Sequence, residues 1–234
     1  MVQDPRTERL LGDIELVRSR GDPARGRLCV MSLVAVLAGE VHSDRPASAS
    51  PLIAAFARPV NDAMDRATRQ RLIPFAPRIL GTVAGDDALR REIVQAELMH
   101  TLLPAIVTDL QAGAHDHAQR RAAELTAMLA GELAATPVDR QPALAQDAGW
   151  DHAALIGPLR VAITAYRDCA GVQQAEAVAR LLIAAVSCLA RPTRRAWYWD
   201  RAIGLLDRLC EVGREAAVPA GREDVESNRR NVTA

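Results

Sequence analysis

The spacing of apolar residues constrains this chain more than any other feature of its sequence. Ala, Leu, Arg, Glu and Gln recur three and four positions apart along most of the 234 residues, which is the period of an amphipathic helix. β-branched and aromatic residues do not alternate with polar ones over a useful length, so the pattern gives strands no support. The sequence therefore predicts an all-α protein, a bundle of about nine helices, several of them kinked by proline.

Glycine, proline and capping residues predict where these helices begin and end. Gly21-Asp22-Pro23 ends the first, and Ser50-Pro51 provides an N-cap and a first-turn proline for the third. Pro74 and Pro77 should split the fourth segment, and Pro104 should bend the fifth near its end. The expected helices cover 5–19, 26–40, a stretch from 51, 66–80, 86–110, 116–133, 151–169, 173–189 and 192–212.

Residues 134–149, with two prolines and several small or polar residues, are the best candidate for a linker. They divide the chain into an N-terminal helical bundle, 1–136, and a three-helix segment, 150–212, which we expect to pack on it. Residues 213–234 are polar without an apolar stripe, so the sequence predicts a disordered tail.

All 29 basic residues are arginine, there is no lysine, and the 29 carboxylates bring the formal charge to zero. Chemistry that needs a primary amine is excluded: a Schiff base, a phosphate-loop lysine or a kinase-type ATP lysine. The neutral balance also argues against a dedicated nucleic-acid-binding protein, whose phosphate contacts need a basic excess. Motifs for a nucleophilic serine, a dinucleotide or a P-loop nucleotide site are absent from the sequence.

The four cysteines lie far apart and form no C-x-x-C pair, which argues against a zinc ribbon or a redox motif. The polar N-terminal residues do not read as a signal peptide, and the apolar run 28–39 is shorter than the roughly 20 residues that span a bilayer. We therefore expect a soluble cytoplasmic protein with reduced thiols and no membrane contact.

Loop 40–46, Glu-Val-His-Ser-Asp-Arg-Pro, is the most concentrated polar segment in an apolar neighbourhood. Its carboxylates, imidazole and hydroxyl could form a metal or acid–base site. They could equally satisfy the open ends of two buried helices through hydrogen bonds, and this structural role is the favoured interpretation. The candidate site residues are Glu40, His42, Ser43 and Asp44, joined by Asn61 and Asp62 of the third helix.

Two further groups suggest a divalent metal. Glu97 and His100 match the E-x-x-H pair of di-iron and di-manganese bundles, although the chain has no second such pair. His115-Asp116 is similar to the metal-binding pair of HD-type phosphohydrolases. The competing interpretations are a solvated helix face for Glu97 and His100, and a helix N-cap for Asp116. No cofactor is expected unless one of these metal sites exists.

Segment 191–201 gathers arginines beside aromatic rings, a combination that can stack on bases or bind a phosphate or carboxylate. Helical spacing would also let Trp199 pack on the bundle, whereas Trp197 and Tyr198 cannot both share its face. We predict a partner or ligand surface here, with the residues Arg191, Arg194, Arg195, Trp197, Tyr198 and Arg201.

Several short motifs in the first part of the chain carry a resemblance to a known group of proteins. They are residues 28–31, Ala38-Gly39-Glu40 with the following Ser43-Asp44-Arg45-Pro46, Ser50-Pro51, Asn61-Asp62 and 79–82. This part of the chain resembles a group of Ala- and Arg-rich helical proteins of high-GC bacteria that share an A-G-E-x-x-S-D-x-P motif. The resemblance implies an all-α fold and an importance of loop 40–46, and it implies no activity. Ser48 stands where many of that group carry Cys, so no cysteine pair is implied here.

The leading hypothesis is a non-catalytic binding protein that recognises a protein partner or a small ligand, since no complete catalytic set can be assembled. The alternative is a metal-dependent enzyme in a helical bundle, of the di-metal or HD-like kind. Nucleotide or nucleic-acid binding through 191–201 is a third hypothesis. A homodimer is compatible with the sequence, because the segment 26–40, apolar on nearly every side, can be buried between two chains.

Overall fold

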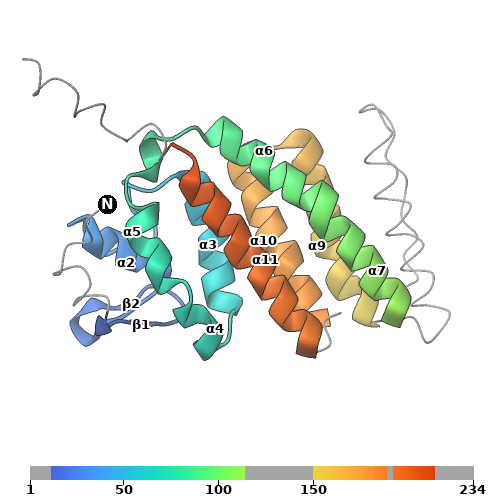
Figure 1. Cartoon of the computed structure of the whole chain (residues 1–234), viewed down its shortest axis with the longest axis horizontal. Coiled ribbons are helices and arrows are strands. Elements are labelled where there is room, and N and C mark those ends of the chain that lie inside the picture. Colours follow the sequence, from blue (N-terminus) through green and yellow to red (C-terminus); the bar gives the residue numbers. More distant parts are fainter. Residues whose placement is uncertain (1–11, 114–149, 189–191, 214–234) are drawn as a thin grey trace, which may run out of the picture.

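A computed structural model describes residues 12–113, 150–188 and 192–213. This part of the chain is mostly helical, which confirms the predicted all-α class (Figure 1). The predicted helix 116–133, the linker 134–149 and nearly all of the predicted tail lie outside the described residues, so the count of nine helices stays a prediction. None of the described helices has the length and apolar character needed to cross a bilayer.

The longer helices are α3 (Pro51–Ala63), α6 (Asp87–Glu97), α7 (Leu103–Gly113), α9 (Trp150–Asp168), α10 (Gly171–Cys188) and α11 (Pro192–Glu211). The shorter ones are α2 (Val30–Leu37), α4 (Arg66–Gln70) and α5 (Ala76–Ile79), with 3-10 turns at Pro23–Arg25, Ile73–Phe75 and Thr82–Ala84. Three two-residue strands, β1 (Glu15–Leu16), β2 (Gly21–Asp22) and β3 (Arg27–Leu28), precede α2.

The predictions of the first two helices are wrong over residues 12–28. Residues 12–28 form a small sheet of order β1-β3-β2, with β1 parallel and β2 antiparallel to β3, instead of the ends of helices 5–19 and 26–40. Gly21 and Gly26 take positive φ angles of 73° and 62°, and a side chain at Gly21 would lie 2.1 Å from the Arg27 carbonyl oxygen. These glycines let the chain reverse within a few residues, which a helical period cannot anticipate.

The predictions from proline and cap residues are confirmed further along the chain. The Ser50 hydroxyl accepts a hydrogen bond from the Ile53 amide at 3.3 Å at the start of α3. Segment 66–80 is split into α4, a 3-10 turn at Pro74 and α5, which begins one residue before Pro77. It ends at Gly81, whose φ is 82°. The last three predicted helices correspond to α9, α10 and α11.

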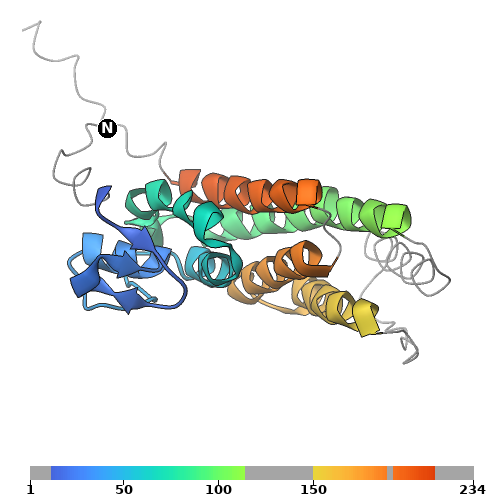
Figure 2. The ribbon, with the colours of Figure 1, turned by 90° about the horizontal axis from the view of Figure 1, so that it is seen from below.

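The helices form two layers, seen edge-on in Figure 2. One layer holds α11 with α6 and α7, and the other holds α9 and α10. Helix α10 packs against α3, α6, α9 and α11, and so lies at the centre of the bundle. Its fully buried Ala175, Ala179 and Ala185 have small side chains, which allow neighbouring helices to approach closely.

The long helix predicted over 86–110 contains one π-helical stretch, Leu98–Leu102, between α6 and α7. Pro104 has no N–H to donate to the His100 carbonyl, and the Leu103 amide instead bonds to the Leu98 carbonyl, five residues back. In an unbroken α-helix Glu97 and Asp109 would point about 120° apart, whereas one extra residue in a π turn reduces this to about 20°. Both carboxylates therefore face α11.

Candidate functional site

The polar loop 40–46 is held mainly by contacts with the backbone. The Glu40 carboxylate accepts hydrogen bonds from the Ala47 and Ser48 amides at 2.7 and 2.9 Å. His42 donates from Nε2 to the Arg20 carbonyl oxygen at 3.1 Å, since a carbonyl can only accept. The Ser43 hydroxyl accepts from the Arg45 amide at 3.0 Å, and Asp44 is half-buried beside it. Glu40, His42 and Ser43 thus bind three different parts of the backbone, and Glu40, His42 and Asp44 form no group suited to a metal ion in the described part of the chain.

Asn61 and Asp62 bind the N-terminal segment rather than loop 40–46. The fully buried Asn61 accepts a hydrogen bond from the Val30 amide at 3.2 Å and donates to the Val17 carbonyl at 2.9 Å. Asp62 accepts from the amide of Ser19 at 2.8 Å. The geometry is that of an anchor, which fixes the strands and the start of α2 against α3.

The aromatic part of segment 191–201 is turned toward α7. Asp109 accepts a 2.7 Å hydrogen bond from the Tyr198 hydroxyl and 3.1 Å hydrogen bonds from Arg194 Nε. The Arg194 guanidinium stacks over Trp197, 4.2 Å from the ring centre. Burial, followed by the hydrogen bond to Asp109 and the charge of that carboxylate, raises the pKa of Tyr198. Of the predicted surface, Arg195 is exposed and Arg191 lies outside the described residues.

Glu97, the last residue of α6, is a second carboxylate that binds side chains of α11. Its carboxylate is 1% exposed and accepts two hydrogen bonds of 3.0 Å from Arg201 and one from Arg208. Its hydrogen bond raises the pKa of Arg201. His100 is exposed in the π stretch, and no group of three His, Cys, Asp or Glu suited to a metal occurs among the described residues. His115 and Asp116 lie outside them.

Cys29 is built into the start of α2 rather than exposed as a nucleophile. Its sulfur accepts a hydrogen bond from the Ser32 amide at 3.3 Å, in the position of an N-cap. Burial raises the pKa of the Cys29 thiol, so the reactive thiolate is disfavoured.

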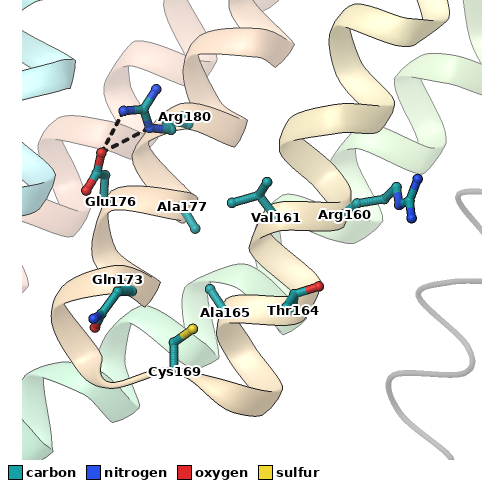
Figure 3. Close-up of a pocket in the computed structure, with 9 residues that line it drawn as sticks. All are labelled: Arg160, Val161, Thr164, Ala165, Cys169, Gln173, Glu176, Ala177 and Arg180. Atoms are coloured by element: carbon teal, nitrogen blue, oxygen red, sulfur yellow. Dashed lines mark hydrogen bonds and ion pairs between the residues drawn. The ribbon is translucent and has the colours of Figure 1, made fainter. Parts of the chain in front are cut away.

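The first of two adjoining hollows lies between α9 and α10, with a volume of about 550 Å³. Figure 3 shows Val161 and Ala165 of α9 facing Ala177 of α10 across it, with Cys169 at the turn between the helices. Glu176 and Arg180 form an ion pair on the α10 side, with the shorter contact at 2.6 Å. Most of the lining is apolar.

The second hollow, of about 450 Å³, lies between the start of α10, α3 and the chain after Asp44. Its apolar lining includes Pro46, Ala55 and Val172, and Arg45 and Arg58 also line it. Glu176 borders both hollows, so they adjoin across α10. We call the two together the α10 surface, made by Arg45, Pro46, Ala54, Ala55, Arg58, Val83, Val161, Ala165, Val172, Glu176, Ala177 and Arg180.

The α10 surface exposes three valine side chains, two on α9 and α10 and one in the 3-10 turn Thr82–Ala84. Val83 and Val161 are each 53% exposed and Val172 is 38% exposed. Single exposed valines are ordinary, but several around adjoining hollows are typical of an interaction site.

A buried glutamine holds the two helices that form the first hollow. Gln174 is 4% exposed, and its amide nitrogen donates to the carbonyls of Tyr166 and Cys169 at 3.2 and 3.0 Å, at the end of α9. Its oxygen accepts from Gln95 of α6 at 3.1 Å. Gln174 thereby satisfies open carbonyls at the helix end and fixes the α9–α10 turn.

Sequence reasoning identified loop 40–46 but not the α10 surface to which Arg45 belongs. One signal in the sequence could have indicated the α10 surface: Val161 is an apolar residue on α9 outside the positions that pack inward. Comparison with protein-family models, curated proteins and solved structures finds no match to this chain.

Proposed function

We propose that this chain is a non-catalytic binding protein of the cytoplasm, which recognises a protein partner through the α10 surface. The observation that carries the proposal is the pair of adjoining hollows, lined by exposed valines and by arginines. Arginine is enriched in protein interfaces, and exposed apolar side chains that gather around a hollow mark interaction sites.

Two features support a protein partner over a small substrate. Both hollows open onto the surface, whereas small ligands bury most of their own area in a cleft. Glu176 contributes the one carboxylate among the residues lining the hollows, and it is paired with Arg180. This lining therefore supports recognition better than acid–base catalysis.

Segment 194–201 is the weaker candidate for the partner surface. Arg194 and Arg201 already pair with Asp109 and Glu97, and Tyr198 is fully buried. A partner or a phosphate would have to displace these contacts before binding there.

The test is quantitative capture of proteins from an extract of the source organism, with the intact chain as bait. We compare the unaltered protein, Val161→Glu and the matched control Leu89→Glu. Leu89 is 45% exposed on α6 and borders neither hollow. We expect at least one partner that both the unaltered protein and the control retain, and that Val161→Glu retains about 10-fold less, because a charge would be desolvated in the interface.

Equal capture by all three baits would contradict a role of the α10 surface. Urea unfolding of each bait shows whether the variants are folded. Stoichiometric iron, manganese or zinc in the purified protein, lost in His100→Ala, would favour the metal-dependent enzyme instead.

A further inference from the structure

We infer that the partner inserts an acidic amphipathic helix into the α10 surface. The inference rests on the proposed function and adds the chemistry of the partner. It is carried by the excess of positive over negative charge around the two hollows and by their apolar lining.

Positive charge exceeds negative charge around the hollows. Four arginines line them, Arg45, Arg58, Arg160 and Arg180, and the single carboxylate, Glu176, is already paired with Arg180. Arg160 extends along the outer side of α9 in Figure 3, away from the hollow. Arg45 and Arg58 are the two arginines that line the second hollow, where they face no unpaired carboxylate among its lining residues.

Arg45 and Arg58 have no carboxylate partner among the described residues, unlike Arg194, Arg201 and Arg208 of α11. Arg58 is half-buried on α3, where water screens its charge less than at an exposed site. A guanidinium in this setting binds carboxylates with charge-assisted, often bidentate, hydrogen bonds. A partner that supplies carboxylates here would satisfy two charges that the described part of the chain leaves unpaired.

The apolar lining defines the rest of the partner segment. Ala54, Ala55 and Val172 lie beside the two arginines, and Val161 and Ala177 continue the apolar lining past Glu176. An amphipathic helix presents apolar side chains at three- and four-residue spacing on one face and can direct carboxylates to its margin. No strand borders either hollow, so strand addition has no template there.

Other occupants fit the charges and the shape less well. A second copy of the chain is formally neutral and brings no excess of carboxylates. An anionic membrane would supply negative charge, but a flat bilayer does not fill two hollows separated by the carboxylate of Glu176.

The experiment is a selection from a random-peptide display library against the immobilised intact chain. A counter-selection uses Arg45→Glu/Arg58→Glu. The matched control is Arg18→Glu/Arg20→Glu, which changes the net charge equally at two exposed arginines outside both hollows. We expect enriched peptides with net negative charge and apolar residues at helical spacing, which bind the control normally and the counter-selected variant at least about 10-fold more weakly.

A quantitative arm uses one enriched peptide and its Glu→Gln version. The Gln version should bind about 10-fold more weakly at low salt, and the difference should shrink as salt is raised. Enriched peptides that are neutral or basic, or that bind Arg45→Glu/Arg58→Glu undiminished, would overturn the inference. In that case the capture experiment with Val161→Glu still decides the proposed function independently.

Two further measurements address the other occupants. A dimer seen by light scattering that becomes a monomer in Arg45→Glu/Arg58→Glu would assign the surface to a second copy and overturn the inference. Binding to anionic phosphatidylglycerol vesicles, without enrichment of acidic peptides, would overturn it in favour of a lipid surface.

Discussion

At the scale of single residues, the arginines differ in whether they bind a partner within the described part of the chain. Arg194, Arg201 and Arg208 neutralise carboxylates between α11 and the α6–α7 helix, and Arg90, fully buried, donates to the carbonyls of Leu209 and Val212 at the end of α11. Arg45 and Arg58 lack such partners among the described residues. Other exposed arginines, such as Arg18 and Arg195, also lack an ion pair among the described residues, but Arg45 and Arg58 share the lining of one hollow.

Tyr198 should give the protein a distinctive alkaline pH dependence. Its folded pKa is raised above the unfolded value of about 10, so the stabilisation is complete below pH ~10 and is lost as the pH rises toward the folded pKa. We expect the free energy of unfolding, from urea titrations, to fall by up to about 1.4 kcal/mol per pH unit in this range from Tyr198 alone.

Tyr198→Phe should remove that component of the slope, and Tyr166→Phe should retain it, because Tyr166 does not contact Asp109. These are the two tyrosines of the chain. A slope that is the same in both variants would assign the pH dependence to other groups.

Glu97 should contribute to the stability of the folded protein. Glu97→Gln leaves Arg201 and Arg208 without a counter-charge at a site where the carboxylate is 1% exposed. The arginine side chains are 35% and 44% exposed, so water offsets part of the loss. We expect a decrease of about 1–3 kcal/mol in the free energy of unfolding. The control Glu92→Gln, at an exposed position of α6, should stay within about 0.5 kcal/mol; equal losses would contradict this account.

Residue-level prediction succeeded where a side chain acts locally. The cap at Ser50 follows from neighbouring residues and accepts an amide hydrogen bond as expected, and the helix predicted from residue 86 begins with Asp86 as its N-cap. Partners 85 to 111 positions away, such as those of Asp109 and Glu97, depend on the packing of α11 and leave no local signal. The sequence also could not predict that Arg45 and Arg58 line the same hollow, because that depends on how the loop packs against α3.

At the scale of elements, the π stretch decides which residues reach α11. Pro104 predicted an interruption, and the structure shows its consequence for register: Glu97 and Asp109 share a face. The helical period that predicted α9, α10 and α11 failed for residues 12–28. There, two glycines with positive φ and the anchors from Asn61 and Asp62 stabilise short strands that a sequence period cannot reveal.

The register argument predicts opposite outcomes for a deletion and an insertion. Removing Thr101 together with Pro104→Ala should convert the π stretch to α-helix while keeping Glu97 and Asp109 on one face, so stability should change by about 1 kcal/mol or less. Inserting one Ala after Thr101 should turn Asp109 about 100° away from Tyr198 and cost about 2 kcal/mol or more.

Urea unfolding of both variants checks this, with the alkaline slope from Tyr198 as a second readout. The slope should persist in the deletion and vanish in the insertion. Equal losses of stability in the two variants would contradict the assigned register.

At the scale of the whole molecule, α10 links the core to the proposed binding surface. Its alanine-rich side packs on α3 in the interior, while Val172, Glu176 and Ala177 reach the hollows. The same helix thus supports the core and part of the surface, and Gln174 fixes its start against α9 and α6. A binding surface on such an element is pre-organised, which reduces the entropy lost on association.

Hydrogen exchange of the intact chain with and without the captured partner tests the central claim most directly. The account predicts slower amide exchange on binding in α10, in the adjoining part of α9 and in residues 45–58, with α11 unchanged. Protection concentrated at residues 194–201, with the α10 surface unaffected, would contradict it.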